Sequence, residues 1–198
     1  MIRLVLLCLS LMTAPLRAEV YPALHDVTGV AVDDVLNIRA APDAAAEVIG
    51  TLAPDATGVE VLAEAEGWGL VNAGERSGYV AMRFLTRIGG PDWNALQTRL
   101  SCLGTEPFWS LQIDPARNET RFQTPEDEAA RIAPISNAWP GQSWSPAAAV
   151  ALPDGLAVLA PAECSDGMSD QSYGIAADLF LAGPDRPRLS GCCRLGQP

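Results

Sequence analysis

The sequence predicts an all-β protein in which a short leader precedes two small barrel-like modules. Strand-like runs recur about every ten residues and are separated by Pro, Gly and Asp, which is typical of small β-barrels. Several runs alternate apolar and polar side chains, most clearly residues 108–114. Four cysteines follow the leader, and an even number of cysteines in a small exported domain favours disulfides over metal thiolates.

Residues 1–18 have the layout of a secretory signal peptide. A basic start is followed by the apolar run 4–12, and a small residue, Ala18, precedes Glu19. The apolar run is too short to span a bilayer, so an uncleaved anchor helix is the less favoured alternative. We therefore expect cleavage after Ala18, to within a few positions. The mature protein is expected to be periplasmic or secreted, with no membrane attachment once the signal is removed.

The charge of the mature chain narrows the choice of partners. The full chain has a formal net charge of −11, and the leader contributes two arginines and no acid, so the mature chain carries −13. A surface this acidic repels phosphate, which argues against nucleic acid as a partner. The same field would attract a basic protein, although a role in solubility alone is the simpler explanation.

The first module, residues 19–88, is expected to contain six short strands separated by turns. Pro42, Pro54, Gly67 and Gly74 lie in the turns between apolar runs. The expected strands are residues 27–32, 35–40, 47–52, 58–64, 68–73 and 77–85.

Four segments of this module resemble the bacterial SH3 domain family: LNIRAAP at 36–42, VIGTL at 48–52, GWGLV at 67–71 and GYVAMRFL at 78–85. The resemblance implies a small barrel with a ligand groove. Some members of the family bind cell-wall peptide, while others bind proteins or act as spacers, so the fold alone does not define the ligand. Arg39, Trp68 and Tyr79 are the candidate binding residues, because an aromatic ring beside an arginine can grip a peptide or a glycan. The alternative is that both aromatic residues only pack in the barrel.

Residues 89–100 are expected to be a linker, because Gly89, Gly90 and Pro91 interrupt the strand pattern and the following residues suit a short helical or extended spacer. The second module, residues 101–198, again shows strand-like runs. Pro153, Asp154 and Gly155 lie between two apolar runs, which predicts a hairpin. The other expected strands are residues 108–114, 119–124, 131–136, 174–183 and 188–196.

The cysteine positions restrict the disulfide pairing. Cys192 and Cys193 are adjacent, so on a strand their side chains point to opposite faces and cannot easily share a partner. One of them is therefore expected to pair with Cys164 and the other with Cys102.

The second module resembles uncharacterised bacterial envelope proteins that carry GxEPFW near the start of the domain and CxDGMSD, then GC, near its end. Here the motifs are residues 104–109, 164–170 and 191–192. The resemblance implies a small β-barrel-like domain with a Cys164–Cys192 bridge, and it implies no particular activity. The Cys102–Cys193 bridge is then expected by elimination, and it would tie the first strand of the module to the last.

The stretch ECSDGMSD, residues 163–170, could be a metal loop, a catalytic cluster or a stapled turn. The spacing of Asp166 and Asp170 does not fit a calcium loop, and a zinc site would need more ligands than these cysteines and His25 offer. A Ser-His-Asp triad has no positioned histidine, and the chain has no lysine. The remaining catalytic alternative pairs Glu106 with one of the two aspartates as acid and base.

The stapled turn is the preferred interpretation, because Asp and Gly favour turns and Cys164 would anchor the bend to the last strand. Glu106 and Trp109 of the first motif are expected to lie near Asp166 and Asp170 at one end of the barrel. These four residues are candidate binding residues. No catalytic residue, metal or cofactor is expected.

The preferred function is that of a non-enzymatic exported envelope protein whose first module binds peptidoglycan or a wall-associated protein. The first alternative is an acidic inhibitor of a basic wall-degrading enzyme, since the charge of the mature chain would suit such a partner. The second alternative is a wall hydrolase that uses carboxylates.

Overall fold

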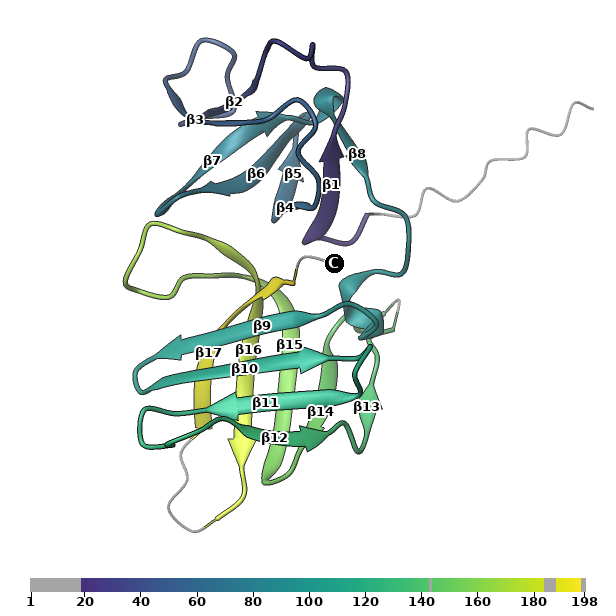
Figure 1. Ribbon diagram of the computed structural model, residues 1–198, viewed down its shortest axis with the longest axis vertical. Helices are drawn as coiled ribbons and strands as arrows, with labels where there is room; N and C mark the ends of the chain where they lie inside the picture. The colour runs from purple at the N-terminus through teal and green to yellow at the C-terminus, as the bar shows by residue number, and fades with distance from the viewer. Residues whose placement is uncertain (1–18, 143, 184–187, 197–198) are drawn as a thin grey trace, which may run out of the picture.

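The structure is a computed structural model that describes residues 19–142, 144–183 and 188–196. The predicted signal peptide, residues 1–18, lies outside the described residues. The described part of the chain contains seventeen β-strands and two short 3-10 turns, with no α-helix, so the predicted all-β class is confirmed. Figure 1 shows two modules, one above the other, joined by a short connection.

The first module contains a three-stranded sheet in the order β4-β1-β8 and a five-stranded sheet in the order β3-β2-β7-β6-β5. The two sheets enclose a small core of Val27, Leu36, Ile38, Val61, Val71 and Val80. The strands are β1 (Ala23–Val27), β2 (Leu36–Arg39), β3 (Val48–Leu52), β4 (Val59–Val61), β5 (Ala63–Ala65), β6 (Trp68–Ala73), β7 (Arg76–Ala81) and β8 (Leu85–Arg87), and the 3-10 turn η1 (Met82–Phe84) precedes β8.

The first strand differs from the expectation. Residues 27–32 are apolar enough to be predicted as a strand, but in the structure β1 begins four residues earlier and spans Ala23–Val27. Gly29 has a φ of +70°, a conformation that ends an extended run. Val32 is 93% exposed and lies in the loop before β2. The loop therefore carries valines at the surface, beside the groove described below.

The second module is one antiparallel sheet of nine strands in the order β12-β11-β10-β9-β17-β16-β15-β14-β13. Its edge strands, β12 and β13, follow one another in the chain, so the sheet curls into an incompletely closed barrel (Figure 1). The strands are β9 (Leu100–Thr105), β10 (Phe108–Asp114), β11 (Glu119–Gln123), β12 (Arg131–Pro134), β13 (Ala138–Trp139), β14 (Ala148–Leu152), β15 (Gly155–Cys164), β16 (Tyr173–Leu181) and β17 (Arg188–Leu195). The expected hairpin around Pro153 and Asp154 joins β14 to β15.

Alternate residues of these strands point into one core. Leu111 and Ile113 of β10, Leu159 of β15, and Ile175 and Leu179 of β16 are among its fully buried side chains. This period of two is the sheet pattern that the sequence shows most clearly over residues 108–114.

The connection between the modules is packed against the second one. Residues 89–100, expected to be a linker, contain the 3-10 turn η2 (Trp93–Ala95). Trp93 is only 2% exposed and joins the core of the second module together with Leu96. Its Nε1 donates a hydrogen bond of 3.1 Å to the carbonyl oxygen of Tyr21 in the first module. The connection therefore fixes the two modules relative to each other.

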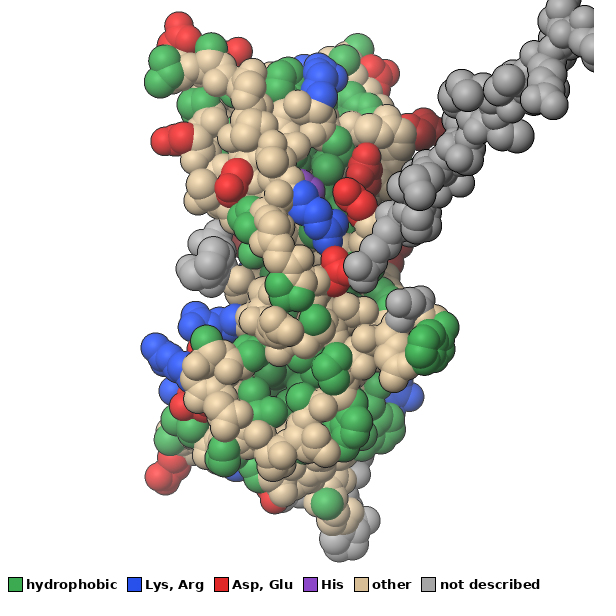
Figure 2. All heavy atoms as spheres, turned by 90° about the vertical axis from the view of Figure 1, so that its right-hand side faces the viewer, with side chains coloured by type: hydrophobic (Ala, Val, Ile, Leu, Met, Phe, Trp, Pro, Cys, Tyr) green, Lys and Arg blue, Asp and Glu red, His purple; other side chains and the backbone are tan. Residues whose placement is uncertain are grey.

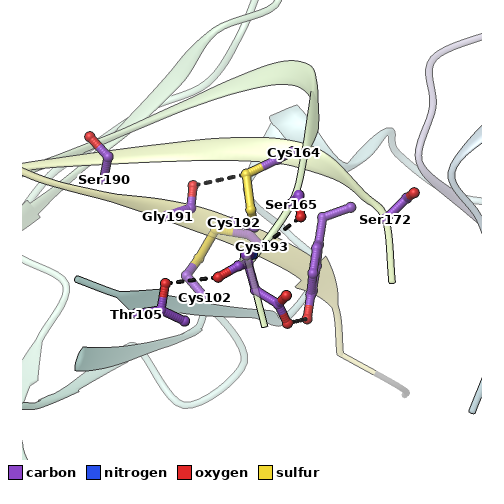
Figure 3. The surroundings of a disulfide bond; sticks show 12 residues. Cys102, Thr105, Cys164, Ser165, Ser172, Ser190, Gly191, Cys192 and Cys193 are labelled. Carbon is purple, nitrogen blue, oxygen red and sulfur yellow. Dashed lines mark hydrogen bonds between the residues drawn. A yellow bond between two sulfur atoms is a disulfide. The ribbon is translucent and has the colours of Figure 1, made fainter. Parts of the chain in front are cut away.

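Both predicted disulfides are present. Cys102 on β9 lies directly opposite Cys193 on β17, and the two are bridged inside the barrel core. Cys164, at the end of β15, is bridged to Cys192. Figure 3 shows the two bridges, which leave β17 from adjacent residues. The alternation of side chains on a strand explains why neighbouring cysteines take different partners.

Candidate functional site

The segment 163–170 forms a tight turn around one carboxylate. The backbone N–H groups of Met168 and Ser169 each donate to Oδ1 of Asp166 at 2.9 Å. The hydroxyl of Tyr173 donates to Oδ2 at 3.2 Å. The two backbone N–H groups hold the pKa of Asp166 below its usual range, so the carboxylate stays ionised. Gly167 has a φ of +71°, which a residue with a side chain rarely adopts.

The two motifs of the second module meet at this turn, as expected. The hydroxyl of Thr105, at the end of β9, donates to the carbonyl oxygen of Asp166 at 2.8 Å (Figure 3). Glu106 follows in the turn between β9 and β10, where its side chain is exposed. The Asp166 carboxylate accepts hydrogen bonds from its own loop and from Tyr173 of β16, so the contact between the motifs passes through Thr105 rather than through a pair of carboxylates.

Trp109 is not a binding residue at the surface, which corrects the expectation. Its side chain is 4% exposed, and its Nε1 donates to the carbonyl oxygen of Ser190 at 3.3 Å. The indole covers two glycines: a Cβ built on Gly104 or on Gly191 would lie 2.6 Å from its ring carbons. Phe108 is the exposed aromatic residue of the motif, at 53%. The alternation of side chains along a strand predicts that Phe108 and Trp109 point to opposite faces, but it does not determine which of the two rings is buried.

Asp170 lies at the boundary between the modules, where its backbone contacts the first module. Its backbone N–H donates to the carbonyl oxygen of Glu75 at 3.0 Å, and its carbonyl oxygen accepts from the N–H of Ser77 at 3.1 Å. We call the loop of residues 165–172, between β15 and β16, the clasp. It holds residues 72–77, the end of the β6–β7 hairpin of the first module.

Side chains complete this contact. The N–H of Ser172 donates to Oγ of Ser77 at 2.8 Å, and Nδ2 of Asn72 donates to the carbonyl oxygen of Ser172 at 3.0 Å. Oγ of Ser77 in turn donates to Oδ1 of Asn72 at 2.6 Å. Sequence reasoning missed these hairpin residues, because polar residues in a turn carry no sign of a partner a hundred positions away.

A buried carboxylate adds a second contact between the modules. Oε1 of Glu60, on β4, accepts a hydrogen bond of 2.8 Å from the backbone N–H of Leu195 on β17. Burial raises the pKa of Glu60 to about 7, although the Leu195 hydrogen bond and the charge of Arg194 act in the opposite direction.

An open groove of about 420 Å³ lies on the first module. Two of the three residues predicted there, Arg39 on β2 and Trp68 on β6, line it. Tyr79 on β7 pairs with Arg39 in the sheet but does not line the groove. The remaining lining residues are Gly29, Val30, Ala31, Asp34, Val35, Leu36, Asn37, Ala44, Ala81, Arg83 and Phe84.

The groove contains two guanidinium groups. Nη1 of Arg39 donates to the carbonyl oxygen of Ala46 at 2.7 Å, and the guanidinium of Arg83 stacks on the ring of Phe84 at 4.6 Å from its centre. Within the described ranges, neither arginine forms an ion pair with an acidic side chain. Six others do: Arg87, Arg99, Arg117, Arg121, Arg131 and Arg188.

The residues that the structure describes hold no group of three or more His, Cys, Asp or Glu side chains arranged to bind a metal ion. His25, the one histidine of the chain, is buried, and Nδ1 lies 3.1 Å from the carbonyl oxygen of Ala23. Burial lowers its pKa, so its ring is held neutral inside the first module. Over the same residues, no helix is both long and apolar enough to cross a membrane.

Comparison with known proteins gives a family match within the first module. The bacterial SH3 domain family matches residues 34–86, from the loop before β2 into β8. No curated protein and no solved structure matches the chain. The likeness of the second module to uncharacterised envelope proteins stays a prediction. A bacterial SH3 domain suggests a cell-wall-binding module, and it is consistent, together with two disulfides, with a protein outside the cytosol.

Proposed function

We propose that this chain is a non-enzymatic envelope protein, periplasmic or secreted, whose first module attaches it to peptidoglycan or to a wall-associated protein. One observation carries the proposal: an open groove lined by Arg39 and Trp68 lies in the module that the bacterial SH3 domain family matches. A concave surface that combines aromatic, aliphatic and charged side chains is the usual form of a peptide or glycan site.

The second module supports this role by holding the first one in a fixed orientation. The clasp, Glu60 and Trp93 each bind across the boundary between the modules. A groove on a rigid support loses less entropy when it binds than a groove on a freely rotating domain.

Sedimentation with purified peptidoglycan tests the proposal. We expect the mature chain to sediment with insoluble peptidoglycan without releasing soluble fragments. Trp68→Leu, which keeps apolar bulk and removes the aromatic face, should weaken sedimentation about tenfold, equivalent to about 1.4 kcal/mol. Trp144→Leu removes an exposed indole from the second module and serves as the matched control.

Two results would contradict the proposal. Release of soluble fragments by the wild-type chain would favour the hydrolase alternative. If the wild-type chain stays in the supernatant at both low and physiological salt, peptidoglycan is not its ligand.

The charge distribution favours a second candidate function, the inhibition of a basic wall-degrading enzyme. Residues 19–88 carry eleven acidic side chains against four arginines. Figure 2 shows acidic side chains spread over the upper module. Co-precipitation with a basic lysozyme that is lost at high salt would support this function, because screening weakens attraction between surface charges.

A further inference from the structure

We infer that the groove of the first module recognises a free carboxylate of a wall peptide, bound by Arg39 and Arg83 beside the aromatic side chains Trp68 and Phe84. The inference rests on the proposed function and adds the chemical group that the groove selects.

The first observation is the placement of the arginines. The first module has only four: Arg39, Arg76, Arg83 and Arg87. Arg87 pairs with Asp92, away from the groove. Two of the other three line the groove and form no ion pair with a described acidic side chain. In a module with eleven acidic residues, two guanidinium groups without acidic partners in one groove favour an anionic ligand.

The second observation is that the structure already holds both groups in place. Arg39 is half-buried and uses Nη1 to bind the carbonyl oxygen of Ala46, which leaves its other N–H groups for a ligand. Arg83 is exposed, and its guanidinium is stacked on Phe84. Guanidinium groups with restricted rotation lose little side-chain entropy when they bind.

The one acidic residue of the groove does not neutralise these arginines. Oδ1 of Asp34 accepts a hydrogen bond of 2.8 Å from the N–H of Val35, the next residue of the same loop. No ion pair joins Asp34 to Arg39 or Arg83 among the described residues, so the lining of the groove carries two positive charges and one negative charge, a net charge of +1.

The third observation identifies the ligand group. The planar guanidinium binds a carboxylate through two parallel hydrogen bonds, and it binds a phosphate in a similar way. The walls of this groove are aliphatic and aromatic, with Val30, Val35, Leu36, Trp68 and Phe84 among them. Such walls suit the side chains of a peptide better than a polyol phosphate. The stem peptides of peptidoglycan carry free carboxylates, and they are the occupant that we assign.

The acidic surroundings do not prevent this binding. At physiological ionic strength, charges are screened over about 8 Å, so acidic side chains distant from the groove repel the ligand weakly. The two arginines act at contact distance, where screening is small. We expect the groove to discriminate by contact rather than by attraction at long range.

The test compares a purified stem peptide with the same peptide amidated at its carboxyl groups, by calorimetric titration of the mature chain. We expect the free acid to bind at least tenfold more tightly than the amide. Arg39→Gln with Arg83→Gln should reduce the affinity for the free acid to that for the amide. Arg117→Gln with Arg121→Gln makes the same change of charge in the second module and should leave the affinity unchanged. Arg83→Gln alone, at an exposed position, repeats the measurement in case the double variant unfolds.

The outcomes separate the inference from the proposed function. Equal binding of the acid and the amide overturns the carboxylate assignment, while sedimentation with peptidoglycan would still support the proposed function. Binding of polyglutamate, but of no stem peptide, that depends on both arginines overturns the wall peptide as occupant in favour of an acidic protein segment. A chain that neither sediments with peptidoglycan nor binds stem peptide overturns both.

Discussion

At the scale of single residues, Trp109 shows how one side chain explains two separated motifs. Its ring covers Gly104, which lies opposite Trp109 on the neighbouring strand β9, and it also covers Gly191 on β17. A glycine at each position leaves the space that the indole occupies, so GxEPFW and GC describe one packing arrangement. The ring that seemed available for a ligand is the ring that joins three strands of the barrel.

Gly104→Ala should destabilise the second module. The added Cβ would lie 2.6 Å from Cε2 of Trp109, so the indole or the strand must shift. Overpacking of this kind costs about 1–3 kcal/mol, which urea unfolding can measure. Gly89→Ala is the control, because a Cβ there meets no atom within 4 Å. Equal stability of the two variants would show that the indole does not depend on Gly104.

Glu60 should make the stability of the protein depend on pH. Its pKa in the folded state is about 7, above its ordinary value of 4.5. The folded state therefore binds more protons than the unfolded state between these values, and stability falls as pH rises through that range. In Glu60→Gln, which keeps an oxygen for the Leu195 N–H, this part of the pH dependence should disappear. Each pKa unit corresponds to about 1.4 kcal/mol. We therefore expect the free energy of unfolding of the variant, relative to that of the wild type, to rise by about 1–3 kcal/mol between pH 4.5 and pH 8.

Urea unfolding of both proteins over this pH range checks the prediction, since all other titrating groups cancel in the difference. A constant difference across the range would mean that Glu60 has the same pKa in the folded and unfolded states.

At the scale of secondary-structure elements, the clasp is a loop of the second module that forms part of the interface with the first module. Its turn is stapled at one end by the Cys164–Cys192 bridge and stabilised inside by Asp166. Its far end, around Asp170, pairs with the β6–β7 hairpin through backbone hydrogen bonds. The bridge therefore supports the contact between modules as well as the second barrel.

Replacing Cys164 and Cys192 together by Ser should have a local effect besides a loss of stability. The bridge joins residues 28 positions apart, for which the chain-entropy model gives about 3–4 kcal/mol. We also expect faster hydrogen exchange at the N–H groups of Ser77 and Asp170, which bind across the boundary. Replacing Cys102 and Cys193 by Ser is the control: it should cost about 4–5 kcal/mol in the same model but leave the clasp stapled. Unchanged exchange at Ser77 in the first variant would mean that the clasp holds without its staple.

At the scale of the whole molecule, the two modules form one unit. The connection inserts Trp93 into the second core while its indole N–H binds the first module. The clasp and Glu60 hold the same boundary through residues of other elements. Two small cores, each limited in buried area, thereby stabilise each other.

Differential scanning calorimetry of residues 19–198 should therefore show a single unfolding transition. Trp93→Ala should cost about 3–5 kcal/mol through the cavity it leaves, and it should separate the unfolding of the two modules into two transitions. Trp144→Ala, which removes an exposed indole, should change neither the midpoint nor the shape of the transition. Two transitions in the wild-type chain would show that the contacts across the boundary are too weak to couple the modules.

The sequence by itself determined the all-β class, the SH3-like module and both disulfide pairs. The period-two pattern and the spacing of turn residues are local properties, and local properties can be read from one chain. The adjacency of Cys192 and Cys193 restricted the cysteine pairing to two arrangements, and the resemblance of the second module to envelope proteins implied the Cys164–Cys192 bridge. Only the tertiary structure decided that Trp109 is core, that Arg83 shares a groove with Arg39, and that residues 163–170 clasp the other module. These facts depend on which residues distant in sequence meet in space, and a pattern along the chain does not contain that information.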